Sequence, residues 1–145
     1  GACPPRHRIV VHYTYRPMGI KGMSQARPCY NTADRSAWGG HILMDSEYWT
    51  HRAWFSTNPT VNEAYRRDIS THELGHILGL DHANTDVNRD GRIANYECVK
   101  SKSGRKPIMC SPNRKPAVAD GGKFTAEYDI PGLKQMLRNY HLRKS

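Results

Sequence analysis

The amino-acid sequence predicts a small α+β domain, in which a short sheet precedes one long helix and a second helix closes the chain. Two β-rich segments occur before residue 46, and residues at helical spacing follow from residue 59. A polar stretch rich in Gly and Pro then separates the long helix from a final helical segment. At 145 residues the chain has the size of one ordinary domain, so we expect a single domain over residues 1–145.

Two strands are predicted ahead of the long helix. Residues 8–15, RIVVHYTY, are rich in β-branched and aromatic side chains, and HILMD, residues 41–45, has the same character. The stretch between them, from Arg16 to about Arg35, is punctuated by Gly, Pro and Ser and is expected to be loop. Aromatic residues crowd without a clear period in residues 46–55, which we expect to be irregular or briefly helical.

The long helix is predicted to run from near Pro59 to about Leu78. Asn58 can cap its free amides, and a proline at the first helical position has its φ angle already set. Gly79 is suited to end the helix because glycine tolerates a left-handed backbone. One face carries side chains at steps of three and four residues, namely Val61, Tyr65, Ile69, His72 and His76.

The chain beyond this helix is predicted to be mostly irregular. Residues 81–120 are polar and contain many Gly and Pro residues. The segment FTAEYDIPGLKQML, residues 124–137, is expected to form a helix that packs against the body of the domain, with Thr125 as its N-cap.

The charge of the chain favours anionic partners. A formal net charge of +9 suits acidic polypeptides, polyanionic cell-wall polymers or nucleic acid. Lys and Arg are scattered rather than gathered in a run, so we expect no specific nucleic-acid binding. No apolar run approaches the roughly 20 residues that span a bilayer, and the first residues lack the apolar centre of a signal peptide. We expect a soluble monomer from which an upstream segment has been removed.

Four cysteines predict two disulfide bonds. Cys3, Cys29, Cys98 and Cys110 form no Cys-x-x-Cys pair, which favours disulfides over zinc ligation. Three pairings are possible, and the local one, Cys3 with Cys29 and Cys98 with Cys110, closes the shortest loops. Disulfides in a small domain are typical of oxidising compartments, so we expect a secreted protein.

The segment HELGHILGLDH, residues 72–82, predicts a zinc site. On a helix His72 and His76 lie one turn apart on the same face, with Glu73 beside them. If the chain turns sharply at Gly79, His82 can supply a third nitrogen, which leaves the fourth tetrahedral position for water. Asp81 is a less favoured competitor for the third ligand.

The same residues predict hydrolysis of a peptide bond. Catalytic zinc lowers the pKa of a bound water to about 7 and polarises the substrate carbonyl. Glu73 is then the expected general base, which takes the proton and later gives it to the departing amine. A purely structural metal site has no need of such a base.

The segment also resembles the extended zinc signature of the metzincins, His-Glu-x-x-His-x-x-Gly-x-x-His. The resemblance implies a secreted zinc endopeptidase close to the small matrixin and snapalysin types. It implies a short mixed sheet, a long active-site helix and a C-terminal helix, with an upper subdomain of about residues 1–79 and a lower one of about residues 80–145. Metzincins also have a methionine turn beneath the zinc, and PIMCSP offers Met109 for that role.

Two further expectations follow from the resemblance. The GGHILMD segment is similar to the upper-rim edge strand of matrixins, which implies that Gly40, His41, Ile42 and Leu43 pair with an extended polypeptide substrate. Those families place a long helix between their early strands, whereas residues 1–38 contain no such pattern. The upper subdomain is therefore expected to be abbreviated.

An inserted loop predicts a structural calcium site. DVNRDGRIANYE, residues 86–97, matches the EF-hand loop pattern, with Gly91 at the sharp bend. Ala94 is expected to contact the ion through water, and Ile93 is expected to anchor the loop. The expected direct ligands are Asp86, Asn88, Asp90, the Arg92 carbonyl and Glu97. A solvated acidic turn without calcium is the alternative.

Two other functions fit part of the sequence. One is a binding module, stabilised by zinc and calcium, for acidic or cell-wall polymers. The other is a zinc amidase that acts on a non-protein amide. The presence of Glu73 argues against the first of these.

Overall fold

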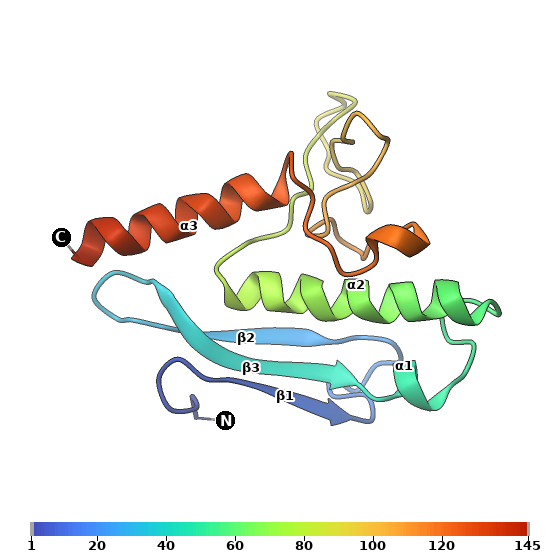
Figure 1. Ribbon diagram of the computed structural model, residues 1–145, viewed down its shortest axis with the longest axis horizontal. Coiled ribbons are helices and arrows are strands. Elements are labelled where there is room, and N and C mark those ends of the chain that lie inside the picture. The colour runs from blue at the N-terminus through green and yellow to red at the C-terminus, as the bar shows by residue number, and fades with distance from the viewer. Residues whose placement is uncertain (1, 145) are drawn as a thin grey trace.

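The computed structural model describes residues 2–144 and shows a three-stranded sheet with a long helix lying across one face (Figure 1). The α+β class is therefore confirmed. The elements in chain order are β1 (Ile9–Thr14), β2 (Gln25–Tyr30), β3 (Ala37–Asp45), α1 (Glu47–Thr50), α2 (Pro59–Ile77), the 3-10 helix η1 (Val118–Asp120) and α3 (Asp129–Lys144).

The sheet is mixed, with the strand order β1-β3-β2. β3 runs parallel to β1 and antiparallel to β2, so it is the central strand and β2 is an edge strand. β2 lies in the stretch that was predicted to be loop, and that prediction is wrong. Its sequence QARPCY has no β-branched residue, and pairing with β3 overrides this weak propensity. Pro28 is tolerated because the strand is at an edge.

The core lies between the sheet and α2. Ile42 and Met44 alternate along β3 and point towards α2, which contributes Ile69 and Ile77. Tyr48 of α1 completes the cluster, and its hydroxyl donates to the carbonyl oxygen of Gly22 over 2.9 Å. Burial of each large apolar side chain contributes roughly 1.5–3 kcal/mol. This packing fixes α2 on the sheet.

The predicted ends of the long helix are confirmed. The Asn58 side chain accepts hydrogen bonds from the amides of Thr60 and Val61, and Pro59 is the first helical residue. The last helical residue is Ile77, and Gly79 has a φ angle of +103°.

The closing helix begins later than predicted. It starts at Asp129, so Thr125 is not its N-cap. Instead Thr125 lies in a turn, where its amide and hydroxyl both donate to the Asp129 carboxylate over 2.8 Å. The same carboxylate accepts from the amides of Ile108 and Met109. Asp129 therefore ties the start of α3 to the chain near residue 108.

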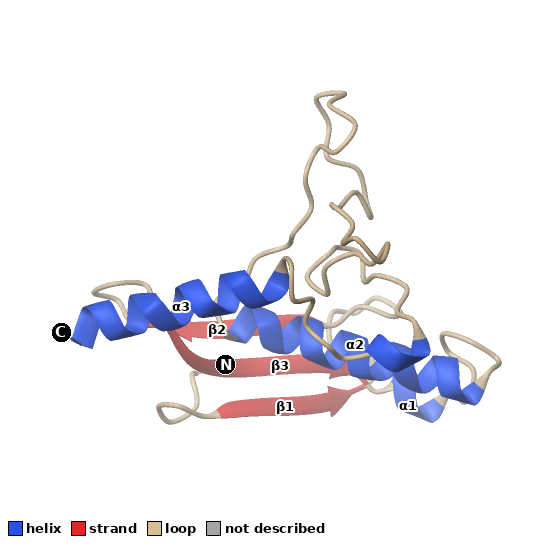
Figure 2. Cartoon of the chain, turned by 45° about the horizontal axis from the view of Figure 1, so that its top comes forward, coloured by secondary structure: helices blue, strands red, loops and turns tan. Residues whose placement is uncertain are grey.

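Residues 78–117 contain no helix or strand, as predicted for this region, and they form the tan loops that rise from α2 in Figure 2. Both local disulfides are formed, Cys3–Cys29 and Cys98–Cys110. The Arg114 guanidinium donates to the buried Asp68 carboxylate at 2.9–3.2 Å, which binds the loops to α2. No helix in the described part of the chain is long and apolar enough to cross a membrane.

A buried carboxylate at the end of β3 holds the loop that joins β1 to β2. Asp45 is 0% exposed and accepts from the backbone amides of Arg16, Gly22 and Glu47 at 2.9–3.2 Å. Burial by itself raises the pKa of Asp45, but these backbone donors outweigh it and hold the pKa below the ordinary value of 3.8. The folded state therefore binds a proton here less tightly than the unfolded chain does.

This lowered pKa predicts a loss of stability in acid. The contribution of Asp45 is fully present above pH 3.8 and is lost as the pH falls through the folded-state pKa. We expect Asp45→Asn to cost about 1–3 kcal/mol at pH 7, because it impairs the acceptor of three backbone amides. We also expect the variant to lose less stability than the native protein below pH 4. Thermal unfolding against pH measures both effects, with Glu63→Gln as control, and parallel curves for Asp45→Asn and native protein would contradict the prediction.

Candidate functional site

Three imidazoles meet at one point above the C-terminal half of α2. His72 and His76 come from α2, and His82 comes from the segment that follows Gly79. One ligand nitrogen from each lies within 4.8 Å of the others. The ring centroids are 4.9 Å, 5.4 Å and 4.8 Å apart for the three pairs. The structure thus brings together the three histidines that the sequence predicted as zinc ligands.

The turn at Gly79 delivers the third imidazole. Its positive φ lets the chain reverse, and the amide of Leu80 donates back to the carbonyl of Gly75 over 2.9 Å. A side chain on Gly79 would also press on Met136 of α3. Glycine is therefore favoured here by the backbone conformation, and any side chain would also require Met136 to shift.

Backbone carbonyls orient two of the rings. His72 Nδ1 lies 2.7 Å from the carbonyl oxygen of Ile108, and His76 Nδ1 lies 2.7 Å from that of Leu80. A carbonyl can only accept, so each Nδ1 carries the proton and each Nε2 keeps its lone pair. In this tautomer the backbone oxygen orients the ring and leaves Nε2 free to bind a metal ion.

Burial favours the neutral form of two of the histidines, His72 and His82. Burial lowers the pKa of His72 to about 4, and the neighbouring His76 and His82 act in the same direction. Burial, followed by His76, also lowers the pKa of His82. Neutral imidazole is the form that binds metal ions.

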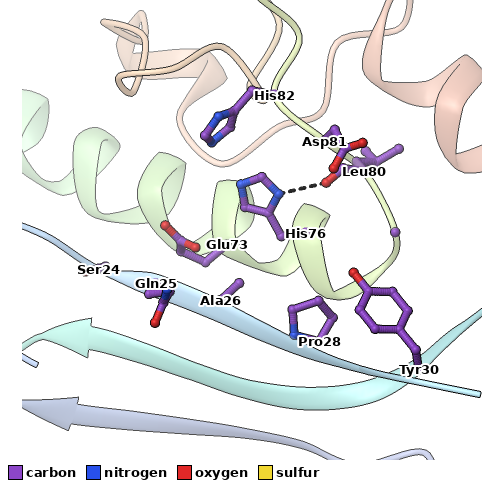
Figure 3. A pocket seen from close by; sticks show the side chains of 11 residues that line it. Ser24, Gln25, Ala26, Pro28, Tyr30, Glu73, His76, Leu80, Asp81 and His82 are labelled. Carbon is purple, nitrogen blue, oxygen red and sulfur yellow. Dashed lines mark hydrogen bonds between the residues drawn. The ribbon is translucent and has the colours of Figure 1, made fainter. Parts of the chain in front are cut away.

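Glu73 lies beside the three rings. Figure 3 shows its carboxylate and the His76 ring projecting from α2 into one cleft, with His82 above them. Glu73 is only 7% exposed, and burial raises its pKa to about 7, against the opposing effect of a hydrogen bond with the backbone of Ala26. A carboxyl group with a pKa near neutrality is suited to general base catalysis.

The cleft has a volume of about 330 Å³ and is bounded by α2, by residues 79–82 and by β2. From the side of the sheet it is lined by Ser24, Gln25, Ala26, Pro28 and Tyr30. β2 is an edge strand, so its outer backbone groups face this cleft rather than another strand. An extended chain can therefore lie along β2 beside the histidines and pair with it.

The residues predicted to bind substrate are not at this edge. Gly40, His41, Ile42 and Leu43 belong to the central strand β3 and pair with β1 on one side and β2 on the other. The His41 ring instead contacts His12 at 2.9 Å and the Ala2 carbonyl at 2.8 Å. The prediction that this segment is an edge strand is wrong because it overlooked β2. The turn-forming residues 31–36, NTADRS, directly ahead of β3 are the signal that could have indicated a hairpin.

Met109 lies against α2 at the site. It is 2% exposed, and a Cβ atom placed on Gly75 would overlap its sulfur. Gly75 lies between His72 and His76 on α2, so Met109 supports the turn of helix that carries these two ligands. The metzincin resemblance implied that Met109 lies in a turn beneath the histidine site.

The loop of residues 86–97 folds around its own carboxylates. Ligand oxygens of Asp86, Asp90 and Glu97 lie within 4.8 Å of one another. The Asn88 side chain joins them, because Asn88 Oδ1 and Asp86 Oδ1 both accept from the amide of Asp90. The Glu97 carboxylate accepts from the amides of residues 87, 88 and 94. Three negative charges are thus held close together at the surface.

The predicted bend of this loop is observed, whereas its predicted anchor is not. Ile93 is 61% exposed and does not anchor the loop, so that prediction is wrong. Gly91 has a φ angle of +84°, in agreement with the predicted bend, and its amide donates to Asp86 Oδ2 over 2.8 Å. No helix flanks residues 86–97, so this is an EF-hand type of loop without the helices of an EF-hand. The carbonyl of Arg92 stays a predicted ligand.

Comparison with protein-family models, curated proteins and solved structures finds no match. The chemistry of the site is therefore inferred from its own residues. Three imidazoles form a nitrogen-rich donor set that could hold a transition-metal ion, and among the described residues no fourth His, Cys, Asp or Glu joins the group. A metal ion held by three protein ligands keeps a coordination position open for water or another ligand.

Proposed function

We propose that the protein is a secreted zinc-dependent endopeptidase of the metzincin type. The observation that carries this proposal is the convergence of His72, His76 and His82 beside the buried Glu73, with a cleft on the open side. Met109 beneath α2 and the turn at Gly79 add support, because both belong to the metzincin arrangement that the sequence resembles.

His72, His76 and His82 would hold the ion. When bound, zinc would lower the pKa of a water molecule and polarise the carbonyl of a peptide bond. The Glu73 carboxylate takes a proton from the attacking water and gives it to the nitrogen of the departing amine. The carbonyl oxygens of Ile108 and Leu80 keep the two helical imidazoles in position during this step.

The proposed substrate is an extended polypeptide. β2 presents a free edge beside Glu73, so a substrate strand can add to the sheet and lie across the histidines. Backbone pairing is independent of side-chain identity, which suits an endopeptidase. We propose that the enzyme acts as a monomer.

The disulfides support the proposed location. Cys3–Cys29 and Cys98–Cys110 account for every cysteine in the chain. Such bonds persist in oxidising compartments and are rare in the cytosol, which supports secretion.

Removal of zinc is expected to abolish activity. We expect metal-free protein not to cleave a denatured, alkylated protein substrate, and one equivalent of zinc to restore cleavage. We expect His82→Ala to bind zinc more weakly, because only two imidazoles remain. Gel-based cleavage assays and elemental analysis of zinc measure these effects, with His51→Ala, a surface histidine outside the site, as the control. Undiminished cleavage by metal-free protein would contradict the proposal.

We further propose that Asp86, Asn88, Asp90 and Glu97 bind a structural calcium ion. The converging oxygens and the twelve-residue EF-hand spacing support this assignment, and the three carboxylates repel one another unless a cation joins them. The proposed ion stiffens the long insertion between His82 and Met109.

Calcium is expected to raise the stability of the protein. At a calcium concentration one hundred times its Kd, the gain is about 2.7 kcal/mol. Chelation of calcium under conditions that spare zinc should lower Tm, and Glu97→Gln should remove most of this dependence. Thermal unfolding with and without calcium tests the prediction, with Glu63→Gln as the control. An unchanged Tm after calcium is removed would favour the alternative of a solvated acidic turn.

A further inference from the structure

The fold brings the positive charge of one loop segment onto one surface. Residues 99–119 contain six Lys and Arg residues and no Asp or Glu. Two arms of this segment lie on either side of a cleft of about 760 Å³, which we call the basic cleft. Its charged lining residues are Lys100, Arg105, Lys106, Arg114, Lys115 and Asp120. Five of the six cations of this segment thus line one surface.

Most of this charge is uncompensated. Arg114 is paired with Asp68 at 2.9 Å, and Arg105 is paired with Asp120 at 2.7 Å. The ammonium groups of Lys100, Lys106 and Lys115 have no carboxylate within 4.0 Å among the described residues. The basic cleft therefore carries three unpaired positive charges, which repel one another until an anion lies between them.

A rigid frame holds these cations in place. The Cys98–Cys110 disulfide joins the two arms of the segment. Arg114 Nη1 donates to the carbonyl of Lys106 over 2.9 Å, and Tyr128 donates to the carbonyl of Lys100 over 3.0 Å. Because the backbone is already fixed, a ligand has less conformational entropy to remove when it binds.

The basic cleft lies close to the proposed active site. The carbonyl of Ile108, two residues beyond Lys106, contacts the His72 ring. Asp68, the partner of Arg114, precedes His72 by four residues on α2, a rise of about 6 Å. A polypeptide that extends only a few residues beyond the catalytic cleft could therefore also contact the basic cleft.

We propose that the basic cleft binds an acidic segment of the polypeptide substrate, a few residues from the scissile bond. This inference rests on the proposed peptidase function and defines its substrate class. Asp and Glu side chains would pair with Lys100, Lys106 and Lys115, while the peptide between them enters the catalytic cleft. Nucleic acid fits less well, because Tyr96 is the single aromatic residue lining the basic cleft and Lys106 lies over its ring at 5.9 Å. No free ring is left on which a base could stack.

Binding is tested first, on zinc-loaded protein carrying Glu73→Ala so that no peptide is consumed. A labelled peptide with four consecutive Glu residues is titrated by fluorescence anisotropy at low and high salt. We expect the triple variant Lys100→Gln, Lys106→Gln, Lys115→Gln to weaken binding about tenfold, since each exposed pair contributes modestly. The matched control Lys21→Gln, Arg52→Gln, Lys134→Gln removes the same charge outside the basic cleft and should change binding less than about twofold.

Cleavage is tested next, on an active protein with Glu73 intact. The measured quantity is the ratio of kcat/KM for a peptide with a four-Glu extension to that for the same peptide with a four-Gln extension. We expect a ratio of about ten for native protein and about one for the triple Gln variant, and Lys→Arg at the same three positions should retain the native ratio. Circular dichroism and Tm verify that each variant is folded.

The outcomes separate the two proposals. Salt-sensitive peptide binding that the triple variant loses, without cleavage of either peptide, would retain the basic cleft as a site for acidic segments and reject the peptidase. Cleavage with equal kcat/KM for both peptides would reject the basic cleft and retain the peptidase. Tighter binding of a single-stranded oligonucleotide of equal charge, lost in the same triple variant, would also overturn the assignment to acidic polypeptide.

Discussion

Replacement of Glu73 by Gln is expected to lower kcat for peptide hydrolysis by about 10²–10⁴-fold, the usual contribution of a general base. Gln has nearly the same shape but cannot take a proton from water. The variant should bind zinc as well as the native protein, because no imidazole is altered. Its circular dichroism spectrum should match that of native protein, since Glu73 accepts no hydrogen bond from another side chain in the described structure.

The measurement compares initial rates for native, Glu73→Gln and Glu73→Ala proteins at equal zinc occupancy. Glu63→Gln is the matched control, because Glu63 is on the same helix, its side chain is 51% exposed and it lies outside the cleft. Equal rates for native protein and Glu73→Ala would refute the role of Glu73 as base. Absence of cleavage by all of these proteins would favour the non-catalytic binding module.

Replacement of Arg114 by Leu is expected to lower the free energy of unfolding by about 3–5 kcal/mol, because it leaves Asp68 as a buried, unpaired charge. Both side chains of this pair are less than 5% exposed. The guanidinium also donates to the carbonyls of Lys106, Asp120 and Lys123, so the substitution leaves three further acceptors without their partner. Urea unfolding provides the measurement, with Arg138→Leu on the surface of α3 as the control.

A double-mutant cycle isolates the ion pair. If the cost arises from the unpaired carboxylate, Asp68→Asn combined with Arg114→Leu should be less destabilised than Arg114→Leu alone. Additive losses would show that the carbonyl contacts, not the ion pair, dominate. Loss of Arg114 should also weaken zinc binding, because the same segment carries Ile108, whose carbonyl orients His72.

The long helix and the histidine cluster could be predicted because their information is local. Asn58, Pro59 and Gly79 mark the ends of α2 within a few residues of sequence, and the four-residue spacing of His72 and His76 places them on one face whatever surrounds them. The position of His82 could be predicted from the turn at Gly79 alone. Of the three possible disulfide pairings, the one formed is the local one that closes the shortest loops.

The rim of the cleft could not be predicted in the same way because it depends on strand order. β2 is formed by pairing with β3, and its own residues give no β signal. The β-rich β3 segment was placed at the edge, whereas β1 and β2 flank it, and its Ile42 and Met44 pack against α2. The basic cleft was missed for a related reason, since only the folded loops bring Lys100 and Lys115 to one surface.

The Cys98–Cys110 bridge has a practical consequence for making the protein. Cys98 directly follows Glu97 of the acidic loop, and Cys110 directly follows Met109 beneath α2, so one covalent bond couples both proposed metal sites. A recombinant product folded in a reducing cytosol would lack this bond, and its acidic loop and methionine would no longer be fixed to each other. Periplasmic or secretory expression, or oxidative refolding, is therefore the appropriate source of material for every metal titration described above.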